Sequence, residues 1–366
     1  MTRMPSKTSI PIGQLRLVSQ QIRASRCATA AEVVATLGAV QAQEYASALW
    51  AIGLRLPGST AVDIERAVQT RSIVRTWPMR GTLHFVPALD VRWMLSLLTP
   101  RVVAGTATRV RQLELTDATF AKAGRILERA LQGNRQLTRE AVFQKFEQAG
   151  IHTAGGRGYH IVFRLSMQGL ICHGPRAGKQ QTFVLLDEWL PTRRSLDRDA
   201  ALAELARRFF CGHGPATVQD FVWWSGLRVT EATSALHAVS SELECRMVTA
   251  TEYWQAPGQS IPDRREVQLL PSFDEYLLGY RDRIAVLDVA HAGKVVPGGN
   301  GMFMPVMVKD GRVIGVWNRV ALKGRVRVTL TPFVALSKKA SSLFTDAGKR
   351  FGAFHGLATL IETDKV

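Results

Sequence analysis

Two glutamines separated by one alanine are the first residues of this sequence whose type and spacing could serve chemistry. They are Gln41 and Gln43, and they lie between Gly38, a residue typical of a helix end, and the strongly apolar stretch Ala46–Leu56. Residues two apart on a helix do not face each other, but in an extended turn both amides could face one ligand. A buried amide without a hydrogen-bond partner costs about 1–3 kcal/mol. Two interpretations therefore stay open: a ligand-binding pair, or amides that cap backbone groups of a turn.

A second polar cluster follows in Val74–Val86, with the sequence VRTWPMRGTLHFV. The turn Pro-Met-Arg-Gly between two expected strands presents Arg80, and alternation along the second strand places Thr82 and His84 on one face. One interpretation is a clamp for a nucleic-acid phosphate with a titratable group close by. The other is a surface arginine beside a histidine that is satisfied within the sheet.

Two later segments bring further candidates. In LLPSFDEYLLGYRDR, residues 269–283, acids and arginines predict an ion-pair network that fixes the junction with the C-terminal region; its members are Asp274, Tyr276, Arg281, Asp282 and Arg283. Asp310-Gly311 is a strong two-residue hairpin turn. The hairpin Met307–Val316, approached by the glycine-rich stretch Pro297–Gly301, could enter a groove of DNA.

Motifs of several enzyme classes are absent from the sequence. No Gly-x-Gly-x-x-Gly follows an expected strand, and residues 174–179 lack the spacing of a phosphate-binding P-loop. No His-Glu-x-x-His, Gly-x-Ser-x-Gly or zinc-deaminase pattern occurs. The four cysteines form no Cys-x-x-Cys pair, and the eight histidines show no ligand spacing. We therefore expect neither a metal nor another cofactor.

The charge of the chain points to polyanions. The sequence has 47 lysines and arginines against 30 aspartates and glutamates, a formal net charge of +17 at pH 7. Between Arg66 and Arg111, eight arginines stand against one acid, Asp90. Guanidinium groups match phosphate oxygens bidentately, which favours nucleic-acid binding. A solvated charged face is the alternative that charge alone leaves open.

The composition is that of a globular protein, with 46% hydrophobic and 21% charged residues. At roughly 150 residues per domain, 366 residues allow two or three units. No uncharged apolar run of 18 residues and no apolar signal segment occurs, so we expect no membrane span and no secretion. The scattered cysteines favour a reducing compartment, the cytoplasm.

The elements that must position these residues repeat three times as short helices followed by two strands, which predicts an α+β fold. The middle copy is clearest: helices at Ala118–Gln132, from Thr138 to Gln148 and at Arg157–Gln168 precede the strands Leu170–His173 and Thr182–Leu186. Three helices and a basic-tipped hairpin are the order of a winged helix. In the third copy we expect strands at Leu243–Val248 and Glu266–Leu270, and linkers are plausible at Ala107–Thr116 and Asp187–Asp197. The expected units are 1–113, 114–190, 191–270 and a β-rich region with a final helix at 271–366.

Together these segments resemble the winged-helix DNA glycosylases of the AlkZ and YcaQ type. The resemblance rests on VQAQEYASALWAIGLRLPG, RTWPMRGTLHFVPALDVRWML, GHGPATVQDFVWWSGL, LLPSFDEYLLGYRDR and DGRVIGVW. It implies tandem winged helices around a C-shaped DNA-binding channel. The family's catalytic signature, Gln, an apolar residue and Gln in the AlkZ-like branch, falls on Gln41, Ala42 and Gln43. Glu44 and Tyr45 stand where Asp-Pro is common in the family, which bears on lesion preference.

The resemblance implies a monofunctional glycosylase without cofactor. It would excise N7-alkylated purines from double-stranded DNA, including bulky adducts and possible interstrand crosslinks, with Gln41 and Gln43 positioning water. The expected DNA contacts are Arg75, Arg80, Thr82, His84 and Arg312. We expect no membrane partner and no obligate protein partner, and a cytoplasmic protein associated with the nucleoid. The alternative is a non-catalytic winged-helix DNA-binding protein, either a transcriptional regulator or a lesion binder.

Overall fold

The computed structural model describes residues 10–263, 266–299 and 301–364. It is a mixed structure of helices and largely antiparallel sheets, in which only β12 and β13 of the described strands pair in parallel, and this confirms the predicted α+β class. The first part of the chain supplies four helices, one short strand and a hairpin: α1 (Ile12–Ser19), α2 (Ala30–Leu37), β1 (Val40–Gln41), α3 (Tyr45–Leu54), α4 (Ala61–Gln69), β2 (Ile73–Met79) and β3 (Thr82–Pro87).

The second part follows the same order of helices and hairpin. Its elements are α5 (Val91–Gly105), α6 (Ala107–Gln112), α7 (Asp117–Leu131), β4 (Leu137–Thr138), α8 (Arg139–Gln148), α9 (Arg157–Met167), β5 (Ile171–His173), β6 (Thr182–Leu185) and α10 (Leu186–Trp189). The predicted helix cap at Thr138 is confirmed, because its hydroxyl accepts from the N–H of Ala141 at 3.2 Å. The linker expected at Ala107–Thr116 is wrong, since α6 occupies most of it.

The hairpins of these two parts join in one six-stranded sheet in the order β1-β3-β2-β5-β6-β4. Arg75 of β2 pairs with His173 of β5, and this pair connects the two hairpins. The β1 strand lies at the edge of the sheet beside β3. The first two of the three predicted repeats therefore share one sheet.

The third part contains α11 (Arg198–His213), α12 (Val218–Ser225), α13 (Val229–Val239), β7 (Glu244–Val248) and β8 (Thr251–Gln255). Its hairpin is β7–β8. The expectation that Glu266–Leu270 supplies the second strand of this hairpin is wrong, because β9 (Val267–Leu270) pairs with β10 of the C-terminal sheet instead. Strand propensity is local, but the choice of a pairing partner is not.

The C-terminal part forms a five-stranded sheet in the order β13-β12-β11-β10-β9. Its remaining elements are α14 (Glu275–Leu278), α15 (Ala292–Val295), β10 (Val306–Lys309), β11 (Arg312–Leu322), β12 (Arg325–Pro332), α16 (Lys338–Phe354) and β13 (Ala358–Thr363). One core packs the six-stranded sheet against α5, α11, α12 and α13, and another joins α2 and α3 to the C-terminal sheet and α16.

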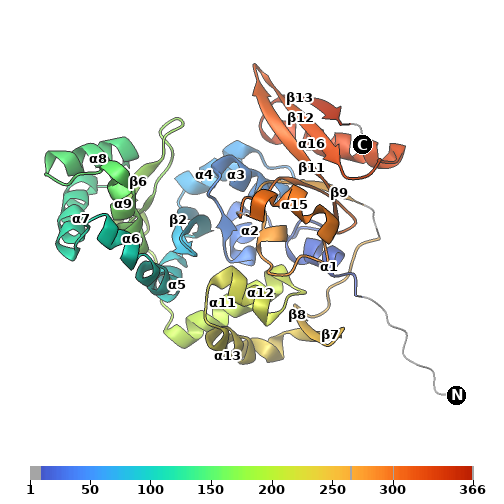
Figure 1. The fold of residues 1–366 in the computed structure, drawn as a ribbon, viewed down its shortest axis with the longest axis horizontal. Helices are drawn as coiled ribbons and strands as arrows, with labels where there is room; N and C mark the ends of the chain where they lie inside the picture. The colour runs from blue at the N-terminus through green and yellow to red at the C-terminus, as the bar shows by residue number, and fades with distance from the viewer. Residues whose placement is uncertain (1–9, 264–265, 300, 365–366) are drawn as a thin grey trace.

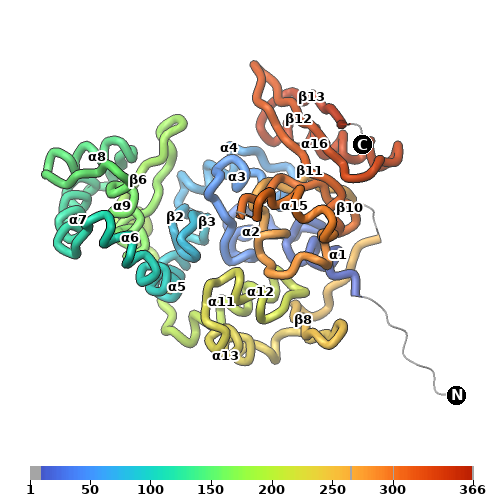
Figure 2. Tube along the Cα trace, in the orientation of Figure 1, coloured from blue at the N-terminus to red at the C-terminus, as the bar shows by residue number. Residues whose placement is uncertain are grey.

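Figure 1 shows α7, α8 and α9 at one end of the molecule and the C-terminal sheet with α16 at the other. The helices α2 and α3 lie between these ends, and the trace in Figure 2 shows the same arrangement. The segment with the two glutamines, between α2 and α3, therefore lies in the central part of the molecule.

Candidate active site

The segment with the two glutamines is extended and lies at the edge of the six-stranded sheet. Gln41 pairs with His84 of β3. The N–H of Ala42 donates to the carbonyl oxygen of Leu83 at 2.7 Å. Because side chains alternate along an extended chain, Gln41 and Gln43 share one face while Ala42 points into the core, where it is fully buried.

The two amides differ in what they contact. Oε1 of Gln43 accepts from the N–H of Leu83 at 3.2 Å, which continues the hydrogen bonding between the two strands. Oε1 of Gln41 is buried and has no hydrogen-bond partner among the described residues. The interpretation that the amides cap backbone groups therefore holds for the Gln43 oxygen, whereas Gln41 keeps an acceptor available for a ligand.

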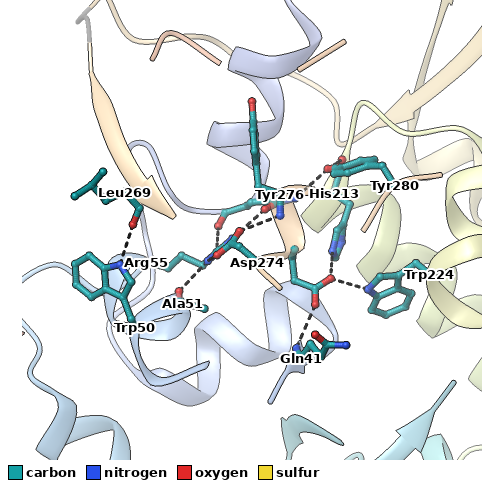
Figure 3. Close-up of polar contacts among 12 residues, drawn as sticks. Gln41, Trp50, Ala51, Arg55, His213, Trp224, Leu269, Asp274, Tyr276 and Tyr280 are labelled. Carbon is teal, nitrogen blue, oxygen red and sulfur yellow. Dashed lines mark hydrogen bonds and ion pairs between the residues drawn. The ribbon is translucent and has the colours of Figure 1, made fainter. Parts of the chain in front are cut away.

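A buried carboxylate holds the backbone of Gln41. Glu275, the first residue of α14, is 1% exposed, and its Oε1 accepts from the N–H of Gln41 at 3.2 Å. Its Oε2 lies 2.9 Å from Nε1 of Trp224 and 3.3 Å from Nε2 of His213 (Figure 3). Burial by itself would raise the pKa of Glu275, but the hydrogen bond and charge of His213 and the charge of Arg80 outweigh it, so the pKa lies below its ordinary value. The carboxylate is thus ionised at neutral pH.

The β2–β3 turn supplies an arginine and an uncharged histidine next to this carboxylate. Nδ1 of His84 lies 2.9 Å from the carbonyl oxygen of Thr82, so this nitrogen carries the proton and donates. Nε2 of His84 then accepts from Nη2 of Arg80 at 3.3 Å. Burial, and secondly the charge of Arg80, lowers the pKa of His84 to about 3. His84 therefore holds Arg80 and does not reach DNA itself, because its side chain is fully buried.

Unpaired polar atoms gather around this turn. Among the described residues, Nε of Arg80, Oγ1 of Thr82 and Oγ1 of Thr76 are buried and have no hydrogen-bond partner, as is true of Oε1 of Gln41. Thr76 and Gln41 both pair with His84, from opposite sides of β3. Buried polar groups normally have partners, so these are the atoms around the turn whose hydrogen-bonding capacity the described residues leave unused.

Arg75 lies on the other face of the sheet and does not point to solvent. Its Nε and Nη2 donate to the carbonyl oxygen of Ala42 at 3.0 and 2.8 Å, and the residue is 3% exposed. Burial lowers the pKa of Arg75 to about 10, so it remains charged at neutral pH. The expectation of a direct DNA contact from Arg75 is not met, because its guanidinium group is committed to the peptide between the two glutamines.

The two residues after the motif connect it to two distant hairpins. Glu44 caps α3 by accepting from the N–H of Ser47 at 3.0 Å and forms an ion pair at 3.0 Å with Arg319 of β11. The ring of Tyr45 lies 4.7 Å from the guanidinium carbon of Arg176, which belongs to the loop between β5 and β6. Glu44 and Tyr45, the two residues that differ from the pattern of the family, thus connect the motif to the β11–β12 hairpin and to the β5–β6 hairpin.

The hairpin Met307–Val316, which was expected to enter a DNA groove, has its turn packed against other parts of the chain. The carbonyl oxygen of Gly311, at its turn, accepts from the hydroxyl of Tyr276 at 2.7 Å, and a Cβ on Gly13 of α1 would stand only 2.2 Å from that oxygen. Arg312 is exposed, but its Nη1 donates to the carbonyl oxygens of Ile284 and Ala285, at 3.1 and 3.3 Å. Residue 300, in the expected approach segment, lies outside the described residues.

The β11–β12 hairpin is the free one in this sheet. Lys323, Gly324 and Arg325 at its tip are exposed, and nothing lies within 4 Å of a Cβ placed on Gly324. Figure 1 shows this hairpin extending away from the body of the molecule.

The residues expected to form an ion-pair network around 274–283 find their partners elsewhere. Asp274 pairs at 2.8 Å with Arg55, the residue that follows α3, and both side chains are buried. The N–H groups of Arg281 and Asp282 donate to Asp220 of α12, at 2.9 and 3.5 Å. The other two residues donate to backbone carbonyl oxygens. The hydroxyl of Tyr276 donates to the carbonyl oxygen of Gly13, and Nε of Arg283 donates to that of Leu277. These contacts tie the segment to α1, to the residue that follows α3 and to α12. Among the described residues, no hydrogen bond or ion pair joins the segment's own acids to its own arginines.

Three residues of the site were not singled out from the sequence: Glu275, His213 and Trp224. Glu275 stands in the stretch Asp274–Leu278, in which every residue is buried. A carboxylate within such an apolar run needs polar partners, and this is the signal that could have identified it. Its partners, His213 and Trp224, belong to two other helices, α11 and α12, so no local sequence pattern could predict them.

Neither a metal centre nor a membrane span is found in the residues that the structure describes. Within 10–263, 266–299 and 301–364, no three His, Cys, Asp or Glu side chains gather as metal ligands. None of the helices in these ranges is both long and apolar enough to cross a bilayer.

Comparison with known proteins gives consistent matches. The family model described as DNA glycosylase AlkZ-like matches residues 34–354. The chain is similar to an interstrand DNA cross-link repair glycosylase from Streptomyces sahachiroi, with 28% identity over 323 residues, 83% of this chain and 85% of the relative. Its fold is similar to that of the solved Streptomyces sahachiroi DNA glycosylase AlkZ, with a TM-score of 0.79 and 24% identity over 97% of this chain and 98% of the other.

Proposed function

Because the chain belongs to the AlkZ-like DNA glycosylase family, we propose that it hydrolyses the N-glycosidic bond of N7-alkylated purines in double-stranded DNA, with water positioned by Gln41 and Gln43. One observation carries this proposal. The two amides share one face of an edge strand, and Oε1 of Gln41 is buried there without a partner among the described residues.

The chemistry suits a site without a strong acid. Hydrolysis of a glycosidic bond passes through an oxocarbenium-like sugar. An N7-alkylated purine already carries a positive charge, so the base leaves without protonation. The free oxygen of Gln41 and the second lone pair of the Gln43 oxygen can orient a water molecule at C1′ and face the developing positive charge.

The groups around the glutamines fit this reaction. His84 is neutral at physiological pH, because burial and Arg80 lower its pKa to about 3. Glu275 is ionised and accepts from the backbone of Gln41, so it fixes the motif and adds negative potential on the side of the amides. Arg80, held by His84, would bind a backbone phosphate beside the lesion.

We extend the proposal to bulky adducts and interstrand crosslinks, which the name of the Streptomyces sahachiroi relative supports. Such a role in DNA repair would place the enzyme with the nucleoid in the cytoplasm. The family assignment favours a glycosylase over a non-catalytic DNA-binding protein, the alternative that the sequence left open.

The test uses a duplex with one N7-methylguanine, protein in excess, and alkali to convert abasic sites into strand breaks. Gln41→Ala and Gln43→Ala are measured beside the wild type, with Gln132→Ala as a matched control because this glutamine is exposed at the end of α7. We expect breaks with wild type and control and a loss of at least about 100-fold with either site variant, roughly 2.7 kcal/mol of transition-state stabilisation.

Two results would contradict the proposal. One is undiminished excision by Gln41→Ala. The other is excision of uracil, an uncharged base that needs more assistance to leave. A second duplex with an interstrand crosslink tests the extension: unhooking by wild type and none by Gln41→Ala is the expected result.

A further inference from the structure

A basic groove lies between α7 and α8, outside the site described above. It encloses about 600 Å³, and its lining includes five cations and no carboxylate: Lys122, Arg125, Arg129, Arg135 and Lys145. The remaining lining side chains are small, apolar or amide. Lys145 is half-buried and the other four cations are exposed.

The sequence builds this groove from one face of each helix. On α7, Phe120, Ala123, Leu127 and Leu131 are buried, which turns Lys122, Arg125 and Arg129 outward. On α8, Val142 and Phe146 are buried, and Lys145 faces α7. Amphipathic packing thus brings like charges together across the groove.

The cations of the groove lack the counter-charges that other helical arginines have. Arg207 and Arg208 of α11 both pair with Glu204, at 2.8 Å. In the described part of the chain, no ion pair is formed by the five groove cations, and Lys122 donates to the carbonyl oxygen of Ala149 at 2.6 Å. Like charges four residues apart on a helix, as at Arg125 and Arg129, are unfavourable unless an anion lies between them.

The spacing of the cations fits a phosphodiester strand. Lys122 and Arg129 are seven residues apart on one face, which at 1.5 Å per residue is about 10 Å. Successive phosphates of one DNA strand advance by about 3.4 Å along the helix axis, so this face spans roughly three of them. Guanidinium groups recognise phosphate oxygens bidentately.

We propose that the α7–α8 groove is a second DNA-binding site, which holds the phosphate backbone of the duplex at a distance from the lesion. Figure 1 places α7 and α8 at one end of the molecule, whereas α2 and α3, which flank the glutamines, lie in its central part. This inference rests on the proposed function in that it takes duplex DNA as the ligand. It adds that the enzyme holds DNA well beyond the damaged nucleotide.

The experiment compares undamaged duplexes of about 12 and about 30 base pairs by fluorescence anisotropy over a salt series, with the full-length protein. The test variant combines Arg125→Ala and Arg129→Ala, which remove two exposed charges while alanine keeps the helix. The charge-matched control combines Lys338→Ala and Lys339→Ala, two exposed lysines at the start of α16. Circular dichroism verifies that both variants fold.

We expect the test variant to bind the long duplex about 10-fold or more weakly at physiological salt, with a salt slope reduced by about 1–2 units, and the short duplex as wild type does. The control should bind both duplexes as wild type does. Equal affinity of wild type and test variant for the long duplex would overturn the proposal. An equal loss with both duplexes, or the same loss in the control, would overturn it as well.

Two further measurements are needed. The first distinguishes duplex DNA from a small polyanion as the ligand of the groove, and the second distinguishes a failure of this inference from a failure of the proposed function. If inorganic tripolyphosphate binds wild type in a manner that needs Arg125 and Arg129, while the long duplex does not, the site serves a small polyanion and our inference is wrong. Excision of N7-methylguanine from the short duplex is measured in parallel. Affinity for undamaged DNA and excision are separate measurements. The proposal for the groove can therefore be contradicted while the proposed glycosylase activity is confirmed, and the activity can be contradicted while the proposal for the groove is confirmed.

Discussion

The backbone N–H of Gln41 donates to the carboxylate of Glu275 at 3.2 Å, although the two residues are 234 positions apart in the chain. Through this bond a buried anion fixes the peptide between Val40 and Gln41. On the other face, Arg75 holds the carbonyl oxygen of Ala42. The backbone of the segment with the two glutamines is therefore held by hydrogen bonds from two distant residues, Glu275 and Arg75. Each of these contacts leads to a prediction.

Replacement of Glu275 by glutamine should reduce excision and stability together. In either orientation of a glutamine amide its NH2 group faces a donor, the N–H of Gln41 or the nitrogens of Trp224 and His213, so we expect the free energy of unfolding to fall by about 3 kcal/mol. With the Gln41 backbone less constrained, single-turnover excision should slow by about 10-fold or more at saturating protein. Denaturant unfolding and the alkali assay measure the two effects, with the exposed Glu128→Gln on α7 as control. A variant as stable and active as wild type would remove the role given to Glu275.

Substitution of Arg75 should change the rate of excision, whereas substitution of Arg80 should change the affinity for DNA. Arg75→Met removes the two hydrogen bonds to Ala42, so we expect about 10-fold slower excision with DNA affinity unchanged. Arg80→Met would remove the phosphate contact that we propose for this residue, so we expect affinity to fall several-fold on any sequence and the salt slope to decrease by about 0.9. Anisotropy and single-turnover rates measured on both variants check this. Undiminished affinity of Arg80→Met would show that this arginine does not bind the DNA backbone.

His84 predicts a direction for the effect of pH on stability. Its pKa is about 3 when folded, because of burial and Arg80, and about 6.5 when unfolded. Between these values the unfolded chain binds the additional proton, so the stability present above pH 6.5 is lost progressively as the pH falls toward 3. His84→Asn should lose about 2 kcal/mol less than wild type between pH 7 and pH 5. The exposed His237→Asn is the control, and denaturant unfolding at both pH values gives the answer.

His84 should not contribute to the pH dependence of the excision rate. A neutral His84 neither donates nor accepts the proton of the reaction, so excision of N7-methylguanine should not change near pH 6.5. A clear inflection there that disappears in His84→Asn would contradict this assignment.

Two arginines of the C-terminal sheet should behave differently toward DNA. Arg325 is exposed at the tip of the free β11–β12 hairpin, whereas Arg312 donates to the backbone of residues 284 and 285 beside a buried turn. We expect Arg325→Ala to weaken DNA binding several-fold and Arg312→Ala to leave it unchanged. The reverse order of affinities would restore Met307–Val316 as the hairpin that contacts DNA.

Local features of this protein were predictable from the sequence because they depend on neighbours within a few residues. Thr138 caps α8 as its spacing predicts, and the apolar period of residues 118–132 became the buried face of α7. The pairing of Gln41 and Gln43 on one face also follows from a local rule, since side chains alternate in any extended segment.

The partners of these elements depended on the tertiary structure. A strand's propensity does not name its neighbour, so Val267–Leu270 was assigned to the third hairpin and in fact joins β10. The turn at Gly311 has a strong hairpin sequence, but only the tertiary structure shows that α1 and Tyr276 pack against it.

The sequence by itself thus determined the class of fold, the motif of two glutamines and its family. The tertiary structure decided that Glu275 fastens the motif, that Arg75 is internal and that His84 is neutral. The physical reason is that burial and charge pairing come from residues far apart in the chain, and both set which groups are ionised and which remain available to a ligand.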